Sequence, residues 1–169
     1  MIIIFWASLS LIIYCFLGYP LLLALVAKFK PKPHRQQNIH LSVSVVIAVW
    51  NEQDVIGRKI SNLLAQDYPA DSLEILIGSD GSDDNTHSIV QSFNDLRITL
   101  LTSPVRQGKT AMLNRLIDKA KGDIIIFNDA RQELKKDAFA QLVSHFIDPT
   151  IGCVSGELVF RPKSGGTAK

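Results

Sequence analysis

The spacing of hydrophobic residues along this chain changes near residue 40. Residues 2–27 form an apolar run that contains no charged side chain. After residue 40, short runs rich in β-branched residues alternate with segments in which apolar residues recur every three or four positions. The first pattern predicts one long apolar helix, and the second predicts strands that alternate with amphipathic helices.

The apolar run is long enough to span a membrane. As a helix at about 1.5 Å per residue, residues 2–27 would extend about 39 Å, and a hydrocarbon core is about 30 Å thick. A cleaved signal peptide is the alternative, but its apolar core measures roughly 7–15 residues and follows basic residues. No Lys or Arg precedes this run, which favours a retained transmembrane helix over residues 1–27.

A cluster of basic residues follows the apolar run. It consists of Lys28, Lys30, Lys32 and Arg35. Cationic flanks of a membrane helix stay on the cytoplasmic side. We therefore expect a single-pass protein of the cell (plasma) membrane, with its N-terminus outside and its soluble domain in the cytoplasm. Residues 28–40 would form a basic juxtamembrane linker and residues 41–169 the soluble domain.

The soluble part is predicted to alternate between strands and helices. Strands are expected at residues 41–49, 73–78, 97–101, 123–127 and 151–160. Helices are expected at residues 52–66, 85–94, 107–121 and 135–147. This alternation is typical of an α/β fold whose mostly parallel sheet is covered by helices on both faces.

Three polar loops follow strands of the predicted sheet. They are residues 48–52, 79–86 and 128–132, and each contains at least one acid. In open parallel sheets, ligands bind beyond the carboxyl ends of the strands. We therefore expect the three loops to meet at one ligand-binding site.

Two of these loops contain candidates for nucleoside binding. Trp50 directly follows the first strand, where an aromatic ring can stack on a base; packing in the core is the alternative. Asp80 follows the second strand, where a carboxylate can accept hydrogen bonds from ribose hydroxyls or a base N–H. Gly81 after it would allow close approach of the backbone. Asp83 and Asp84 are better explained as caps of the following helix.

Asp129 and Lys109 are candidates for phosphate and metal chemistry. Asp129 ends an apolar strand, and a charge there needs a partner. Mg²⁺, which uses one or two carboxylates plus substrate phosphates, is one partner; an ion pair with Arg131 or a helix cap is the alternative. Lys109 lies in the sequence GKT, which resembles the end of a P-loop, but Ser103 stands where that motif needs glycine. Lys109 can still meet phosphate as a point charge.

Composition and charge exclude several other classes. An apolar fraction of 47% with 20% charged residues excludes a disordered chain. Two cysteines, Cys15 and Cys153, exclude a disulfide scaffold and a four-cysteine zinc site. A net charge of +2 gives no reason to expect nucleic-acid binding. The loop after the first strand lacks the G-x-G-x-x-G pattern of a dinucleotide-binding oxidoreductase.

Five segments in order resemble the family 2 glycosyltransferases of GT-A fold. They are VSVVIAVWNE, ILIGSDGSDDNT, RQGKTAMLN, GDIIIFNDARQ and DPTIGCVSGEL. The likeness covers about residues 41–160 and is to the membrane-anchored, processive-like branch that includes hyaluronan, chitin and poly-N-acetylglucosamine synthases. It implies inverting transfer of a sugar from a nucleotide-diphospho-sugar, a UDP-sugar, in cell-surface polysaccharide synthesis, with Mg²⁺ or Mn²⁺ as cofactor.

The resemblance also implies roles for individual residues. The nucleotide-sugar site would contain Ala48, Trp50, Glu52, Asp80, Lys109 and Arg131. Asp80 would hold the uridine or its ribose, and Lys109 would approach the donor phosphates. Asp129 would be the metal-binding first acid of a DxD-like motif. Arg131 takes the third position of that motif, where a guanidinium could neutralise the diphosphate directly.

The resemblance gives no catalytic base within the chain. The family's base belongs to a later acidic motif, so we expect it beyond Lys169, and Glu157 is expected on a strand near the sheet edge instead. We interpret residues 41–169 as the donor-binding half of a transferase, C-terminally truncated. The missing half or other synthase subunits would then be partners. The alternative is a non-catalytic, membrane-tethered nucleotide-binding remnant or one half of a split enzyme.

Overall fold

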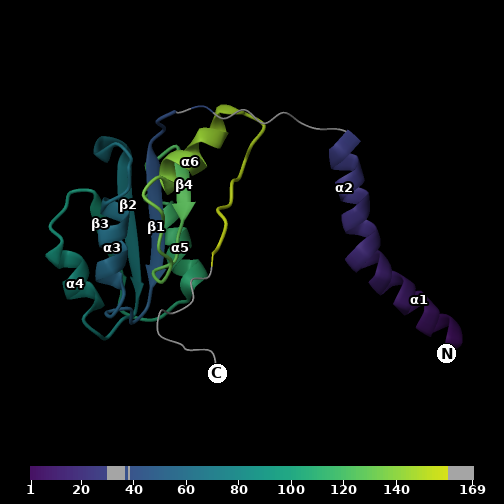
Figure 1. The fold of residues 1–169 in the computed structure, drawn as a ribbon. Helices are drawn as coiled ribbons and strands as arrows, with labels where there is room; N and C mark the ends of the chain where they lie inside the picture. Colours follow the sequence, from purple (N-terminus) through teal and green to yellow (C-terminus); the bar gives the residue numbers. More distant parts are fainter. Residues whose placement is uncertain (30–36, 38, 160–169) are drawn as a thin grey trace, which may run out of the picture. The chain divides into compact units, whose positions relative to one another are not determined.

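The computed structural model describes residues 1–29, 37 and 39–159. The chain divides into two compact units, Met1–Arg35 and Gln36–Lys169. Each is described by itself here, and both can be followed in Figure 1. Of the expected basic cluster, Lys30, Lys32 and Arg35 lie outside the described residues, as does the end of the expected last strand.

The N-terminal unit is one apolar helical stretch. It comprises α1 (Ile2–Ile13), the π-helical turn η1 (Tyr14–Gly18) and α2 (Tyr19–Phe29). Pro20 explains the π turn, because proline has no N–H and its ring crowds the carbonyl four residues earlier. The backbone N–H of Tyr19 accordingly donates to the carbonyl of Tyr14. The most apolar 18-residue window within residues 2–29 has a mean hydropathy of 2.3, so this helix is confirmed as a candidate membrane span.

The second unit is built on a parallel sheet of four strands. They are β1 (Val43–Val49), β2 (Leu73–Asp80), β3 (Ile98–Ser103) and β4 (Ile124–Phe127). Their order is β3-β2-β1-β4, and every neighbouring pair is parallel. The predicted α/β fold is confirmed. Because β2, β1 and β4 are neighbours, the three loops predicted to bind a ligand leave the same edge of the sheet.

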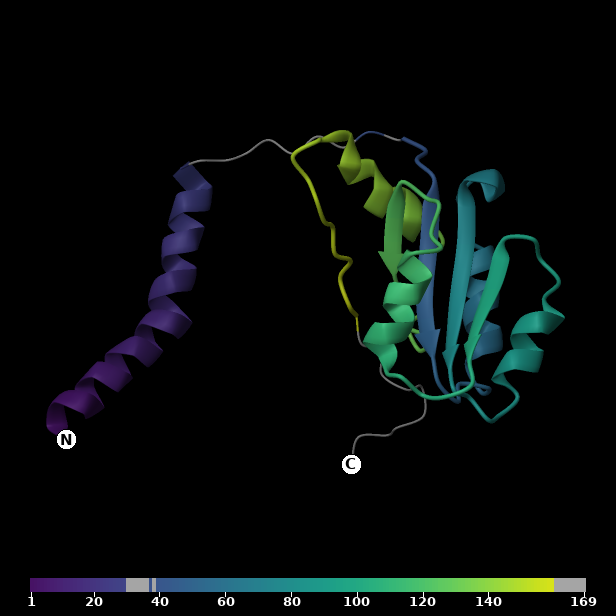
Figure 2. The same ribbon diagram turned by 180° about the vertical axis from the view of Figure 1, so that it is seen from behind.

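Helices cover both faces of this sheet (Figures 1 and 2). The alternation of side chains along β1 sends Val45 and Ile47 into the larger core, with α3 (Ile56–Leu64), α4 (Thr86–Ser92) and α6 (Ala138–Ser144). Val46 faces the opposite side, where Leu116 of α5 (Lys109–Ile117) packs on it. Two short 3₁₀ turns, Ala70–Ser72 and His145–Ile147, complete the unit.

A glycine lets α5 lie close to the sheet. A Cβ atom at Gly78 would fall 2.5 Å from Cγ of Met112, so a larger residue there would have to displace the side chains that α5 packs on the sheet. Gly78 pairs with Ala48 of β1, one residue from the carboxyl end of that strand. The N-terminal end of α5, where Lys109 lies, is thereby held near the loops that follow β1 and β2.

The expected fifth strand is wrong for the residues that the structure describes. Residues 151–159 form no strand, and Glu157, Leu158 and Val159 are exposed. A strand requires a neighbour for its backbone N–H and C=O groups. The segment has an apolar pattern, but it makes no ladder with β4, the edge strand of the sheet. Glu157 is therefore not on the expected edge strand.

The expected helix 52–66 begins later, at Ile56. The reason lies in side chains from another loop. The backbone N–H of Glu52 donates to Oγ1 of Thr86, and that of Gln53 donates to a carboxylate oxygen of Asp84. These bonds hold residues 52 and 53 in an extended turn beside the loop after β2.

Candidate functional site

The loops that follow β1 and β2 are joined by reciprocal hydrogen bonds. Asn51, whose φ of 50° is left-handed, donates from its side-chain amide to Asp83 at 2.6 Å. Its side-chain oxygen accepts the backbone N–H of Asp83 at 3.0 Å, and its own N–H donates to Ser82 Oγ at 3.1 Å. Asp84 accepts the backbone N–H of Thr86 at 2.9 Å, at the start of α4. The capping interpretation fits Asp84, which bonds to the first residue of α4, and is wrong for Asp83, which bonds to Asn51 instead.

Asp80 fixes the loop between β3 and α5. Its side chain is only 3% exposed, and its two carboxylate oxygens accept the backbone N–H groups of Gln107 and Gly108 at 2.8 and 2.7 Å. Gly108 has a φ of 99°, and a Cβ at Gly81, whose φ is 71°, would lie 2.8 Å from the backbone nitrogen of Arg106. A carboxylate has about four lone-pair sites, so these two bonds leave acceptor capacity for a ligand.

Trp50 lies at the surface of the site with a cation over its ring. Its side chain is 45% exposed, which rules out the alternative of core packing. The guanidinium carbon of Arg106 is 3.8 Å from the centroid of the ring, a cation–π contact. Arg106 comes from the loop that Asp80 holds, so Trp50 and Asp80 belong to one connected arrangement.

Two ion pairs cross the carboxyl edge of the sheet. Lys109 Nζ at the start of α5 lies 2.8 Å from Oδ1 of Asp129, and Arg131 lies 2.9 Å from Oε1 of Glu52. The hydrogen bond from Lys109 lowers the pKa of Asp129, against the effect of its partial burial. The hydrogen bond and charge of Glu52 raise the pKa of Arg131. The loops after β1 and β4 are joined through the second pair.

Ala48 is the remaining predicted site residue. It is half-buried near the end of β1, in register with Gly78 of β2. It makes no side-chain hydrogen bond, because it has no polar atom there. The contacts given above connect the other six predicted residues, directly or through the loop of Arg106. These residues are Trp50, Glu52, Asp80, Lys109, Asp129 and Arg131.

Lys59 is a residue of the site that sequence reasoning missed. It lies on α3 with 2% exposure, and its Nζ donates to the backbone carbonyl of Gln132 at 2.7 Å. Burial lowers the pKa of Lys59 to about 8, although the charges of Asp129 and Glu133 oppose that shift. Lys59 thus anchors the turn that carries Asp129 and Arg131. A lysine on the apolar face of the predicted helix was the signal that could have found it.

The donor set at Asp129 does not fit a divalent cation held by the protein alone. Among the described residues there is no group of three or more His, Cys, Asp or Glu side chains placed to bind one. Asp129 already receives the ammonium of Lys109, and the motif's third position is the cation Arg131. Mg²⁺ is bound by one or two carboxylates together with substrate phosphates. A metal site at Asp129 could therefore be completed only by phosphate oxygens of a bound nucleotide-sugar.

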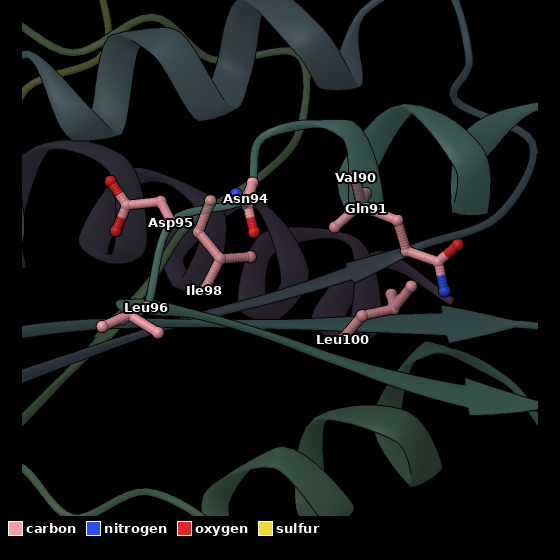
Figure 3. A pocket seen from close by; sticks show the side chains of 7 residues that line it. All are labelled: Val90, Gln91, Asn94, Asp95, Leu96, Ile98 and Leu100. Carbon is pink, nitrogen blue, oxygen red and sulfur yellow. The ribbon is translucent and has the colours of Figure 1, made fainter.

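A hollow elsewhere in the domain has a different character. It lies between the end of α4 and the start of β3, lined by aliphatic and amide side chains together with Asp95 (Figure 3). Asp95 is paired with Arg97 at 2.8 Å, and the hydrogen bonds from Arg97 lower the pKa of Asp95 to about 2. None of the predicted site residues lines this hollow, so the candidate site stays at the carboxyl edge of the sheet.

Comparison with known proteins defines the class of protein. Residues 44–169 match the sequence profile of glycosyl transferase family 2. The chain belongs to this family, and the predicted resemblance is confirmed.

Its relatives include enzymes that make glycolipids and polysaccharides. The chain is 32% identical to the beta-monoglucosyldiacylglycerol synthase of Synechocystis sp. over 66% of its own length and 24% of that protein. It is 33% identical to the poly-beta-1,6-N-acetyl-D-glucosamine synthase of Staphylococcus aureus over 72% of its length and 30% of that protein. Its matched region thus spans about a quarter to a third of these two relatives.

Solved structures show the same GT-A-like architecture. The mannosyltransferase PcManGT from Pyrobaculum calidifontis, in complex with GDP-Man and Mn²⁺, superposes with a TM-score of 0.71 and 32% identity. The match covers 85% of this chain and 45% of that one. S. aureus TarS 1–349 in complex with UDP-GlcNAc superposes with a TM-score of 0.57 and 25% identity, covering 64% of this chain and 32% of that one.

Proposed function

We propose that this chain is a membrane-anchored module that binds a nucleotide-diphospho-sugar, a UDP-sugar, for inverting sugar transfer in cell-surface polysaccharide synthesis. The observation that carries the proposal is the set of contacts that joins an exposed tryptophan, a buried aspartate and two exposed cations at the carboxyl edge of a parallel sheet, where ligands bind in such folds. Two similar structures support it, because they contain GDP-Man and UDP-GlcNAc.

The nucleoside would lie over the ends of β1 and β2. The exposed ring of Trp50 offers a stacking face for the base. Ala48 and Glu52 would line the pocket beside it. Asp80 would accept a hydrogen bond from the base or the ribose with its remaining lone pairs, while it keeps the loop of Arg106 in place.

The diphosphate would lie between α5 and the loop after β4. Transfer breaks the bond between the anomeric carbon and a diphosphate oxygen, so negative charge develops on the leaving group. Fixed cations aimed at that charge stabilise the transition state. Lys109 and Arg131 are the exposed cations nearest to this position, 60% and 71% exposed respectively.

The base that would take the proton of the acceptor hydroxyl is not assigned to any described residue. We keep the expectation that it lies beyond Lys169 or on another subunit. Without such a base, the chain would bind donor and turn it over slowly, which is also the behaviour of a non-catalytic remnant or of half of a split enzyme. We therefore expect hydrolysis of the bound donor to remain near the uncatalysed background.

The Mg²⁺ or Mn²⁺ at Asp129 stays a prediction, because Asp129 would have to give up the ammonium of Lys109 to bind it. The structure of PcManGT that was compared contains Mn²⁺. Since the donor set of this chain does not fit a resident ion, no step of the proposed function is routed through one.

The membrane anchor is the second part of the proposal. Residues 1–27 would cross the plasma membrane, 28–40 would form the linker, and 41–169 would lie in the cytoplasm. Cys153 is exposed and provides the test. A thiol reagent that cannot cross membranes should label Cys153 in opened cells and leave it unlabelled in intact cells. Labelling in intact cells would show that the orientation is reversed.

Titration calorimetry on the full chain in detergent micelles tests donor binding. UDP-GlcNAc and GDP-Man would be titrated separately, each with and without millimolar Mg²⁺ or Mn²⁺. We expect UDP-GlcNAc to bind, Asp80→Ala to weaken its binding about a hundredfold, and Asp118→Ala, which removes an exposed acid at the end of α5, to leave the binding unchanged. A folded chain that binds neither sugar nucleotide in any buffer would show that the proposed function is wrong.

A further inference from the structure

We infer that Lys109 and Arg131 neutralise the donor diphosphate in place of a divalent cation, so that donor binding requires no metal ion. The inference rests on the proposed function and deepens it at the phosphate end of the same site. It follows from how Asp129 and Glu52, the two acids paired with these cations, are already bonded.

The first acid, Asp129, has both carboxylate oxygens engaged. Oδ1 accepts the ammonium of Lys109 at 2.8 Å, and Oδ2 accepts the backbone N–H of Arg131 at 3.4 Å. A divalent ion binds a carboxylate oxygen at about 2.0–2.1 Å for Mg²⁺ and demands near-octahedral oxygen ligands. At this carboxylate the ion would meet an ammonium group on one oxygen and would have to displace it.

The second acid, Glu52, is also taken. Nε of Arg131 lies 3.0 and 3.2 Å from the two oxygens of Glu52, and its terminal nitrogen Nη2 lies 2.9 Å from Oε1. This is a fork of hydrogen bonds on one edge of the guanidinium. Glu52 is 17% exposed and Arg131 is 71% exposed, so the acid is set back and the cation projects from it.

The free edge of Arg131 is suited to a phosphate. A guanidinium has five N–H donors in a planar fork, and the fork matches phosphate geometry. Among the described residues, the hydrogen bonds and the ion pair of Arg131's side chain use only the Nε and Nη2 edge. The remaining donors keep a fixed direction because Glu52 holds the group. Arg131 is therefore preorganised to bind an anion without leaving its partner.

The charges also balance as they would with a metal. One divalent cation with two carboxylates has a net charge of zero. Lys109 and Arg131 with Asp129 and Glu52 have the same net charge, distributed over four side chains at the same edge of the sheet. Lys59, buried beneath the turn that carries Asp129, adds a further cation close to that turn. The chain thus supplies by itself the positive charge that a metal would bring.

The test is calorimetric titration of UDP-GlcNAc into the full chain in micelles, in EDTA and in millimolar Mg²⁺ or Mn²⁺. We expect dissociation constants that agree within about twofold in the two buffers. Arg131→Ala and Lys109→Ala should each weaken binding in EDTA roughly tenfold to a hundredfold, the effect of losing a charged hydrogen bond. Arg58→Ala and Lys119→Ala, which remove exposed cations on α3 and after α5, are the matched controls.

Arg131→Asp should give the largest difference between binding in EDTA and binding in a divalent metal ion. The variant has acids at positions 129 and 131, the first and third positions of the DxD-like motif. This variant should lose binding in EDTA and regain it in Mg²⁺ or Mn²⁺, and circular dichroism would verify that it folds. Binding by the unaltered chain only when a divalent ion is present would overturn the inference and leave the proposed function standing. Absence of binding in every buffer would overturn both.

Discussion

The two ends of the parallel sheet both carry acids, but these acids are bonded in different ways. At the amino end, Glu74 accepts the backbone N–H of Lys121 at 2.6 Å and the hydroxyl of Ser44. Asp123 accepts the hydroxyl and the backbone N–H of Ser42 at 2.6 and 3.2 Å. These two acids therefore bond to neutral donors, whereas Asp95, just before the start of β3, pairs with Arg97 two residues away.

At the carboxyl end, two of the acids bond to long, charged side chains from other elements, whereas Asp83 and Asp84 bond to neutral groups. Asp129 pairs with Lys109, and Glu52 pairs with Arg131. Exposed ion pairs of this kind contribute only about 0–1 kcal/mol to stability, because solvent screens them and two flexible side chains must be ordered. The fold gains little from these pairs, whereas the proposed diphosphate would gain charged hydrogen bonds from the same cations.

The difference teaches which end is structural and which is available for binding. Bonds from neutral donors at the amino end satisfy the oxygens of Glu74 and Asp123 and join distant parts of the chain, although both carboxylates keep their negative charge. The cations at the carboxyl end are exposed, so they contribute little to the free energy of folding. They keep N–H donors that can bind an anion. Substitutions at the amino end should therefore change the free energy of unfolding, and those at the carboxyl end should change donor affinity.

Asp80 is the clearest exception to this comparison, because it lies at the carboxyl end but is buried and bonds to backbone N–H groups. We therefore expect its substitution to change both donor affinity and stability. Asp80→Ala would leave the N–H groups of Gln107 and Gly108 without their acceptor. We expect donor binding to weaken about a hundredfold and the free energy of unfolding to fall by about 1–3 kcal/mol for the lost buried bonds. Calorimetry and urea unfolding measure the two effects.

Asp80→Asn is the matched control, because it keeps one acceptor oxygen and nearly the same shape. It should retain part of the stability and lose donor affinity. Unchanged affinity in Asp80→Ala, with only stability reduced, would limit Asp80 to a structural role.

Ser44 tests the amino end. Its Oγ accepts the backbone N–H of Gly122 at 2.7 Å and donates to Glu74, and the residue is fully buried. Ser44→Ala should lower the free energy of unfolding by about 1–3 kcal/mol and leave the dissociation constant for UDP-GlcNAc unchanged. Ser61→Ala, at an exposed position of α3, is the control and should change neither quantity. Weaker donor binding by a fully folded Ser44→Ala chain would contradict the division between the two ends.

The sequence could predict that Asp80 and Asp129 lie at one edge of the sheet. Each acid directly follows a run that can be recognised as a strand, and strands that alternate with helices run parallel, so their carboxyl ends meet at one edge. The runs 41–49, 73–78 and 123–127 are apolar enough to identify strands, and polar residues mark their ends. The structure extends β2 to Asp80, because the strand continues to pair with β3 up to Ser103. The sequence could therefore locate the acids, but it could not show what each acid is bonded to.

Contacts between distant residues explain what the sequence could not predict. Arg106 lies over Trp50, and Lys59 reaches the carbonyl of Gln132, 73 positions away. The expected strand over 151–160 failed for the same reason, since pairing depends on a neighbour that no local pattern contains. Such contacts arise from the packing of elements, and no spacing rule within one segment reports them.

Trp50 sharpens the comparison at the carboxyl end, because its ring is exposed and adds little to the core. Trp50→Ala should weaken donor binding roughly tenfold, the effect of losing a stacked base, with no change in the free energy of unfolding. Trp50→Phe keeps a smaller stacking face and should lose less affinity. If Trp50→Ala destabilised the chain without affecting binding, the ring would serve packing and not the base.

Lys59 gives the smallest expected effect and the one that depends on pH. Its pKa is about 8 in the folded chain and 10.5 in the reference state, so between these values the unfolded chain binds more protons. The cost of burying the charged amine is fully present below about pH 8, and stability should rise as pH increases from 8 toward 10. Lys59→Met removes the titrating group. The unfolding free energy of the unaltered chain, relative to that of the variant, should therefore rise by about 1 kcal/mol between pH 7.5 and about pH 9, and further by about pH 10. Urea unfolding at pH 7.5, about 9 and about 10 measures it, and a difference independent of pH would show that Lys59 titrates normally.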